Sequence, residues 1–188
     1  MTGLVRKAML FTAAGSLIAS AAMAGVPSPG NSTVPACIQL VGNLAGAPDA
    51  VGSFTVTVRD LANNALNGAS VVVDLSGATD VAICGNQLDL GTLVNCAAKT
   101  TRKFTNLAGQ VSFVLLGGSD GAGHATTLHG GARIYANGTL IGSPTAACFD
   151  LDGASGVSIN DLSVWLTDFG TPGSPAFGRS DFDCDGSI

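Results

Sequence analysis

The feature that most constrains the fold is a series of short runs in which apolar and polar residues alternate. The runs 54–59, 69–75 and 110–116 each carry an apolar residue at every second position, and many of these residues are β-branched. Such alternation is typical of strands that bury one face. Asn137-Gly138, which separates two further runs, predicts a hairpin closed by a type I′ turn.

Gly and Asn turn signals separate about seven or eight expected strands, so the chain is expected to be mainly β. That number suits a two-sheet sandwich of the immunoglobulin kind, followed by a small helical segment at the C-terminal end. A jelly roll or a small barrel is the alternative, because alternation alone does not show how a sheet closes. The expected strands are 37–41, 54–59, 70–75, 81–84, 99–104, 110–116 and the hairpin 132–141.

Acidic residues form the second pattern. All thirteen are aspartate, a residue that favours turns over helix interiors. Calcium loops place carboxylates at positions 1, 3, 5 and 12, a backbone carbonyl at 7 and a polar group at 9. Residues 150–161 fit this pattern except at position 5, where Ala154 has no ligand atom. The expected calcium ligands are Asp150, Asp152, the carbonyl of Gly156, Ser158 directly or through water, and Asp161.

A second acidic turn begins at residue 181. Asp181, Asp183 and Asp185 hold positions 1, 3 and 5, and Ser187 offers the carbonyl at position 7. The given residues end at Ile188, position 8 of this loop, so no position-12 carboxylate is among them. Because the first loop also lacks one ligand, we expect weak calcium binding, with a dissociation constant of about 0.1 to 1 mM.

Between the two turns, apolar residues recur with the spacing of one helical face. Leu162, Trp165, Leu166 and Phe169 lie at i, i+3, i+4 and i+7, and Gly170 then ends the pattern. A helix this short is marginal by itself in water. We therefore expect its apolar face to pack against a second helix that follows the second turn.

The order of acidic loop, short helix, Phe-Gly ending, linker and second acidic loop, from Cys148 to Ile188, resembles the dockerin repeat of bacterial extracellular proteins. The resemblance implies that each repeat is half of an EF-hand, with an aspartate such as Asp161 at loop position 12. It also implies a cohesin module as the partner. We therefore expect a dockerin-like region at 147–188, with an incomplete second repeat.

Residues 54–60, 63–73 and 105–113 carry, in turn, a strand ending in Asp, a Gly-Ala-x-Val strand and a Thr-x-x-x-Gly-x-x-x-Phe strand. In these features the chain resembles bacterial immunoglobulin-like domains of the invasin type. The resemblance implies a spacer or an adhesive module outside the cell. We expect this β-sandwich to occupy residues 36–146.

Residues 1–24 have the form of a secretory signal peptide, with Arg6 and Lys7, a short apolar run, and Ala22-Met23-Ala24 at the expected cleavage site. The run is shorter than the roughly 20 apolar residues of a membrane-spanning helix. We expect a secreted or cell-surface protein without membrane insertion, whose leader is followed by a linker at 25–35. The negative net charge of the chain argues against a nucleic-acid partner.

The chain has five cysteines, which in an exported protein favour disulfides over metal sites. A bond between Cys148 and Cys184 would join the two acidic turns. A bond between Cys84 and Cys96 would close a short excursion within the β domain. The odd count leaves one thiol without a partner.

The sequence offers few groups of residues with the spacing of a catalytic site. His124 and His129 lie in a Gly-rich stretch, 117–131, that we interpret as a surface loop. We therefore expect a non-catalytic secreted structural or binding protein with a calcium-binding tail. The alternative is an accessory component of an extracellular polysaccharide-degrading complex, which docks through the tail and binds carbohydrate through the β domain. The β domain has one tyrosine and no tryptophan, which favours the first interpretation.

Overall fold

The computed structural model describes residues 25–41, 50–78, 81–83, 87, 89–120, 131–154, 156–169 and 180–185. The expected signal peptide, Cys84, His124, His129 and Ser187 lie outside these residues. The described strands are β1 (Cys37–Leu40), β2 (Ser53–Thr57), β3 (Ser70–Asp74), β4 (Val81–Ile83), β5 (Leu93–Asn95), β6 (Thr100–Phe104), β7 (Gln110–Val114), β8 (Gly117–Ser119), β9 (Arg133–Ala136), β10 (Thr139–Gly142) and β11 (Thr145–Cys148). A 3₁₀ helix (Ala50–Gly52) precedes β2, and the α-helix α1 (Ile159–Asp168) follows β11.

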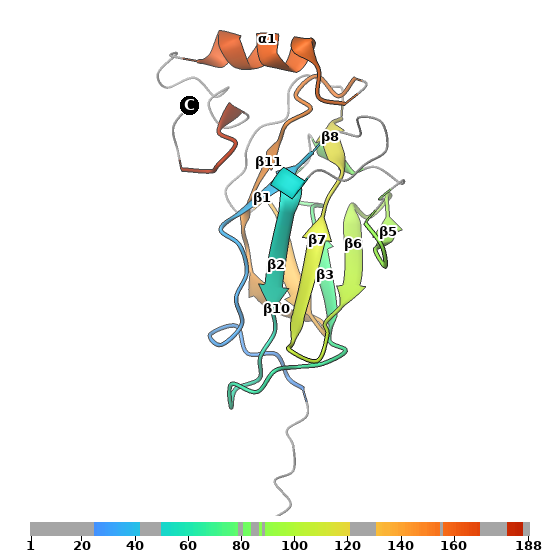
Figure 1. Ribbon diagram of the computed structural model, residues 1–188, viewed down its shortest axis with the longest axis vertical. Helices are drawn as coiled ribbons and strands as arrows, with labels where there is room; N and C mark the ends of the chain where they lie inside the picture. The colour runs from blue at the N-terminus through green and yellow to red at the C-terminus, as the bar shows by residue number, and fades with distance from the viewer. Residues whose placement is uncertain are drawn as a thin grey trace, which may run out of the picture.

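The protein is mainly β, as the alternation predicts. The largest sheet of the described residues is antiparallel and has the strand order β10-β9-β3-β6-β5. Two antiparallel pairs, β2–β7 and β4–β8, and one parallel pair, β1–β11, accompany it. Figure 1 shows the strands running along the long axis of the molecule, with α1 lying across the end near β8 and β11. None of the described helices is long and apolar enough to cross a membrane.

One hydrophobic core connects these sheets. Burial along β3 alternates strictly, with Val71 and Val73 inaccessible to solvent, and β7 buries Val111 and Phe113 in the same way. Phe54 of β2 stacks on Phe113 with ring centroids 5.4 Å apart. Apolar residues of β1, β4, β9 and β11 join the same cluster, so the first and last strands close the core together.

Each expected strand is present, and three further strands were missed. β5 lies at the edge of the large sheet and is mostly exposed, so it carries no buried alternation. β11 is buried at all four positions and therefore shows no alternation either. The interpretation of 117–131 as a surface loop was wrong for β8, whose Gly117 and Ser119 are buried.

The hairpin between β9 and β10 has the expected turn. Asn137 and Gly138 both have positive φ, 46° and 82°, as a type I′ turn requires. The Asn137 side chain also accepts a hydrogen bond from the Ser70 backbone N–H at 2.9 Å, which attaches the turn to β3.

Replacing Gly138 with alanine is expected to lower the free energy of unfolding by about 1 to 2 kcal/mol, because a Cβ is disfavoured at this φ. Urea unfolding would measure the difference. The matched control is Gly30→Ala, since a Cβ meets no atom within 4 Å at either position but only Gly138 has a φ in the left-handed region. Equal losses for the two variants would contradict the strain argument.

Candidate metal centre

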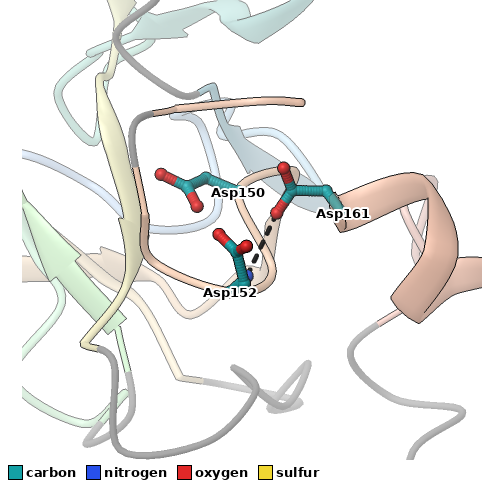
Figure 2. Close-up of side chains that lie close together, drawn as sticks. All are labelled: Asp150, Asp152 and Asp161. Carbon is teal, nitrogen blue, oxygen red and sulfur yellow. Dashed lines mark hydrogen bonds between the residues drawn. The ribbon is translucent and has the colours of Figure 1, made fainter. Parts of the chain in front are cut away.

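The first acidic turn forms a compact cluster directly after β11. Oxygen atoms of Asp150, Asp152 and Asp161 all lie within 4.8 Å of one another. Figure 2 shows the three carboxylates around a common space, with Asp161 reaching into it from the first turn of α1. The structure therefore brings together the three charged ligands that the loop spacing predicted.

Asp161 organises this loop. One carboxylate oxygen, Oδ1, accepts the backbone N–H groups of Leu151 at 2.6 Å and Asp152 at 3.0 Å. The other, Oδ2, accepts the backbone N–H of Ser158 at 2.7 Å and its hydroxyl at 3.0 Å. Gly153 and Gly156 take left-handed backbone conformations, with φ of 69° and 76°, and turn the chain back towards the helix.

Ser158 is the N-cap of α1 and completes a capping box with Asp161. Its hydroxyl accepts the backbone N–H of Asn160 at 3.1 Å while donating to Asp161. The sequence prediction treated both residues only as ligands and missed this structural role. The Ser-x-x-Asp spacing just before an apolar helix was the signal that would have indicated it.

These bonds have a consequence for metal binding. An ionised carboxylate has about four lone-pair positions, and Asp161 accepts four hydrogen bonds from the protein. Asp161 therefore contributes its charge to the cluster, whereas direct ligation by it requires the release of a protein donor.

Asp150 is the member of this cluster whose carboxylate has a buried oxygen without a hydrogen-bond partner among the described residues. Asp150 is only 7% exposed, and the oxygen concerned is Oδ1. Burial raises the pKa of this carboxyl, the negative charge of Asp161 raises it further, and the N–H of Gly153 opposes the shift. A buried carboxylate with one unpartnered oxygen, beside two other carboxylates, is costly unless a cation compensates it. The residues present thus fit a hard divalent cation.

The second acidic turn also gathers its carboxylates. Asp181, Asp183 and Asp185 lie with ligand atoms within 4.8 Å of one another. The Asp185 backbone N–H donates to Oδ1 of Asp181 at 3.1 Å and to Oδ1 of Asp183 at 3.3 Å. These bonds form a tight turn in which Cys184 has a φ of 62°.

Neither of the two disulfides that the sequence left possible is formed. Cys184 is bonded to Cys37 of β1, 147 residues earlier in the sequence, and not to Cys148. Cys148 is a buried thiol at the end of β11 that contacts the Asp150 carbonyl at 3.2 Å. Cys96 is an exposed thiol, so the proposed bond between Cys84 and Cys96 is not formed. The correct pair joins the second acidic turn to the first strand.

Three further contacts connect the two acidic turns with their surroundings. Phe149 stacks on Phe182 with ring centroids 4.4 Å apart. The Gln39 side chain of β1 donates to the Phe182 carbonyl at 2.7 Å. At the other end of α1, the Ser180 hydroxyl donates to the buried carboxylate of Asp168 at 2.6 Å. The tail is therefore attached to the β region through side chains as well as through the disulfide.

α1 buries two acidic residues, and its apolar face is largely exposed among the described residues. Its buried residues are Asp161 and Asp168, whereas Leu166 and Phe169 of the apolar face are 58% and 56% exposed. Trp165 is half-buried, and the centroid of its ring lies 4.9 Å from that of the Phe169 ring. The predicted second helix falls outside the described residues, so the structure does not test that packing.

A scan against protein-family models and searches of curated proteins and of solved structures found no match. Function is therefore inferred from the geometry of the site.

Proposed function

We propose that this protein is a non-catalytic, secreted structural or binding protein whose C-terminal region binds calcium through the acidic loop 150–161. In this proposal the region 147–188 is dockerin-like, and the region 36–146 is an immunoglobulin-like sandwich. Calcium stabilises the tail, and the β region serves as a spacer or as a module that binds a partner at the cell surface.

The observation that carries the proposal is the buried Oδ1 of Asp150, which has no partner in the described part of the chain although two other carboxylates lie beside it. Natural proteins satisfy nearly all buried polar atoms, so an orphan of this kind indicates a missing ion or water. Three converging negative charges favour a cation over water. All the candidate donors are oxygen atoms, which suits a hard cation such as calcium.

Replacing Asp150 with asparagine is expected to have opposite effects with and without calcium. In the absence of calcium, the free energy of unfolding of the variant should exceed that of the wild type by about 1 to 2 kcal/mol. A neutral amide is less costly to bury than a carboxylate with an unpartnered oxygen. The wild-type protein should gain about 2.7 kcal/mol from calcium at 100 times the dissociation constant, and the variant should lose this gain. Urea unfolding, followed by the fluorescence of the single tryptophan, Trp165, would measure both effects.

The experiment is best done with Asp183→Asn in both proteins, so that the second cluster does not contribute. Magnesium at the same concentration controls for ionic strength. The proposal would be abandoned if wild-type stability were the same in calcium and in chelator.

The exposed apolar face of α1 favours one alternative, a component that docks to a protein scaffold. Exposed apolar patches often mark protein interfaces, and a mostly apolar hollow of about 340 Å³ lies between α1 and the two loops, lined in part by Phe149, Leu162, Trp165 and Phe182. Calcium-dependent retention on an immobilised cohesin module would support this alternative. No retention in either calcium or chelator would leave the structural role.

A further inference from the structure

The wall of the cation site opposite α1 is a strand of the β region. The Ser119 backbone N–H of β8 donates to the Asp150 carbonyl at 2.8 Å, and β8 passes beside the Asp150 side chain (Figure 2). β8 in turn pairs with β4, with Gly118 opposite Ala82. The acidic loop is therefore built directly against the edge of the β region.

Gly118 has no side chain where one would meet Asp150. A Cβ on Gly118 would lie 2.7 Å from Oδ2, 2.9 Å from Cγ and 3.2 Å from Cβ of Asp150, and these are its three nearest atoms. Contacts below 3.0 Å force a displacement, and the terminus of a single aspartate side chain is the group most easily displaced. The lack of a side chain at position 118 thus creates the slot that holds the Asp150 carboxylate.

We propose that Gly118 is a positioning residue for the cation site: by leaving this slot, β8 holds the Asp150 carboxylate towards Asp152 and Asp161, and the bound cation then ties β8 to the tail. This inference rests on the proposed calcium function and extends the site beyond the acidic loop. Two observations support it: the slot accommodates Oδ2 of Asp150, and Oδ1 of the same carboxylate is buried without a partner among the described residues.

Gly118→Ala should turn the carboxylate away from the cluster and leave the backbone in place. Loss of a group that orients a ligand weakens metal affinity by about 10- to 100-fold, and we expect a loss of that size for calcium. The titration would follow Trp165 fluorescence and heat, again with Asp183→Asn in every protein. Gly30→Ala is the control for a glycine replacement in open space and should bind calcium as the wild type does.

A double-mutant cycle separates positioning from general destabilisation. In calcium-free buffer, Gly118→Ala should destabilise the wild-type protein more than a protein that carries Asp150→Ala, because the displaced carboxylate is then absent and only the 3.2 Å contact with Cβ remains. Equal destabilisation in both backgrounds would overturn the proposal. So would unchanged calcium affinity in Gly118→Ala when the wild type binds calcium. If the wild type itself binds no calcium, the proposed function fails first.

A measurement on the wild type covers the case in which Gly118→Ala does not fold. Hydrogen exchange of the Ser119 amide, which is bonded to the Asp150 carbonyl, should slow by at least about tenfold when calcium replaces chelator. An unchanged exchange rate at saturating calcium would overturn the proposal without any variant.

Discussion

Replacing Cys37 and Cys184 together with serine is expected to lower the free energy of unfolding by about 4 to 5 kcal/mol, the largest effect of any change considered. The bond spans 147 residues, and in the chain-entropy account the stabilisation grows with the length of chain that the bond closes. The bond also holds the second acidic turn against β1. Urea unfolding of the oxidised wild type and of the double variant would measure the loss.

Cys96→Ser is the matched control, since Cys96 is an exposed thiol that closes no loop. Its free energy of unfolding should stay within about 0.5 kcal/mol of the wild type, as is usual for surface substitutions. Treatment of the wild type with a reductant should reproduce the double variant. A double variant as stable as the control would show that the tail is held by its side-chain contacts alone.

Asp161→Ala is expected to cost about 3 kcal/mol even in the absence of calcium. The substitution removes the acceptor of four hydrogen bonds, including the backbone N–H groups of Leu151, Asp152 and Ser158, and each buried donor left unsatisfied costs about 1 to 3 kcal/mol. Part of the cost will be relieved by water entering the loop. Calcium binding at the first cluster should be lost as well.

Asp152→Ala is the comparison for this variant. Asp152 also belongs to the cluster, but among the described residues its side chain accepts one hydrogen bond, from the backbone N–H of Ala154 at 2.8 Å. The variant should weaken calcium binding while changing the calcium-free stability by about 0.5 kcal/mol or less. Thermal unfolding in chelator, followed by Trp165 fluorescence, would compare the two proteins. Similar losses would contradict the structural role assigned to Asp161.

The mainly β class and the acidic clusters were predictable because both depend on local spacing. Alternation located β3 and β7 directly, since each buries one face of its strand. Loop spacing brought Asp150, Asp152 and Asp161 together as expected. β11 escaped prediction because it is buried on both faces, and β8 because a Gly-Gly-Ser strand has no side-chain pattern to detect.

Features that depend on distant pairing could not be predicted in this way. The partner of Cys184 follows from contacts between the tail and the first strand, and the spacing of cysteines carries no information about such contacts. The slot at Gly118 likewise depends on β8 lying against the acidic loop. The burial of Asp161 and Asp168 instead of the apolar face of α1 follows from hydrogen bonds that only the folded tail supplies.

The pairing of β1 with β11 places a constraint on the order in which the chain folds. The first strand hydrogen-bonds to the last, in parallel register from Cys37–Thr145 to Leu40–Cys148. Contacts of such high sequence separation form slowly, because the entropy cost of closing the intervening chain precedes the favourable energy of the contacts. During synthesis, at about 5 to 20 residues per second, β1 emerges many seconds before its partner and has an unpaired edge throughout. A chaperone that shields this strand until β11 has been synthesised is therefore expected to raise the yield of native protein more than one that acts on the completed chain.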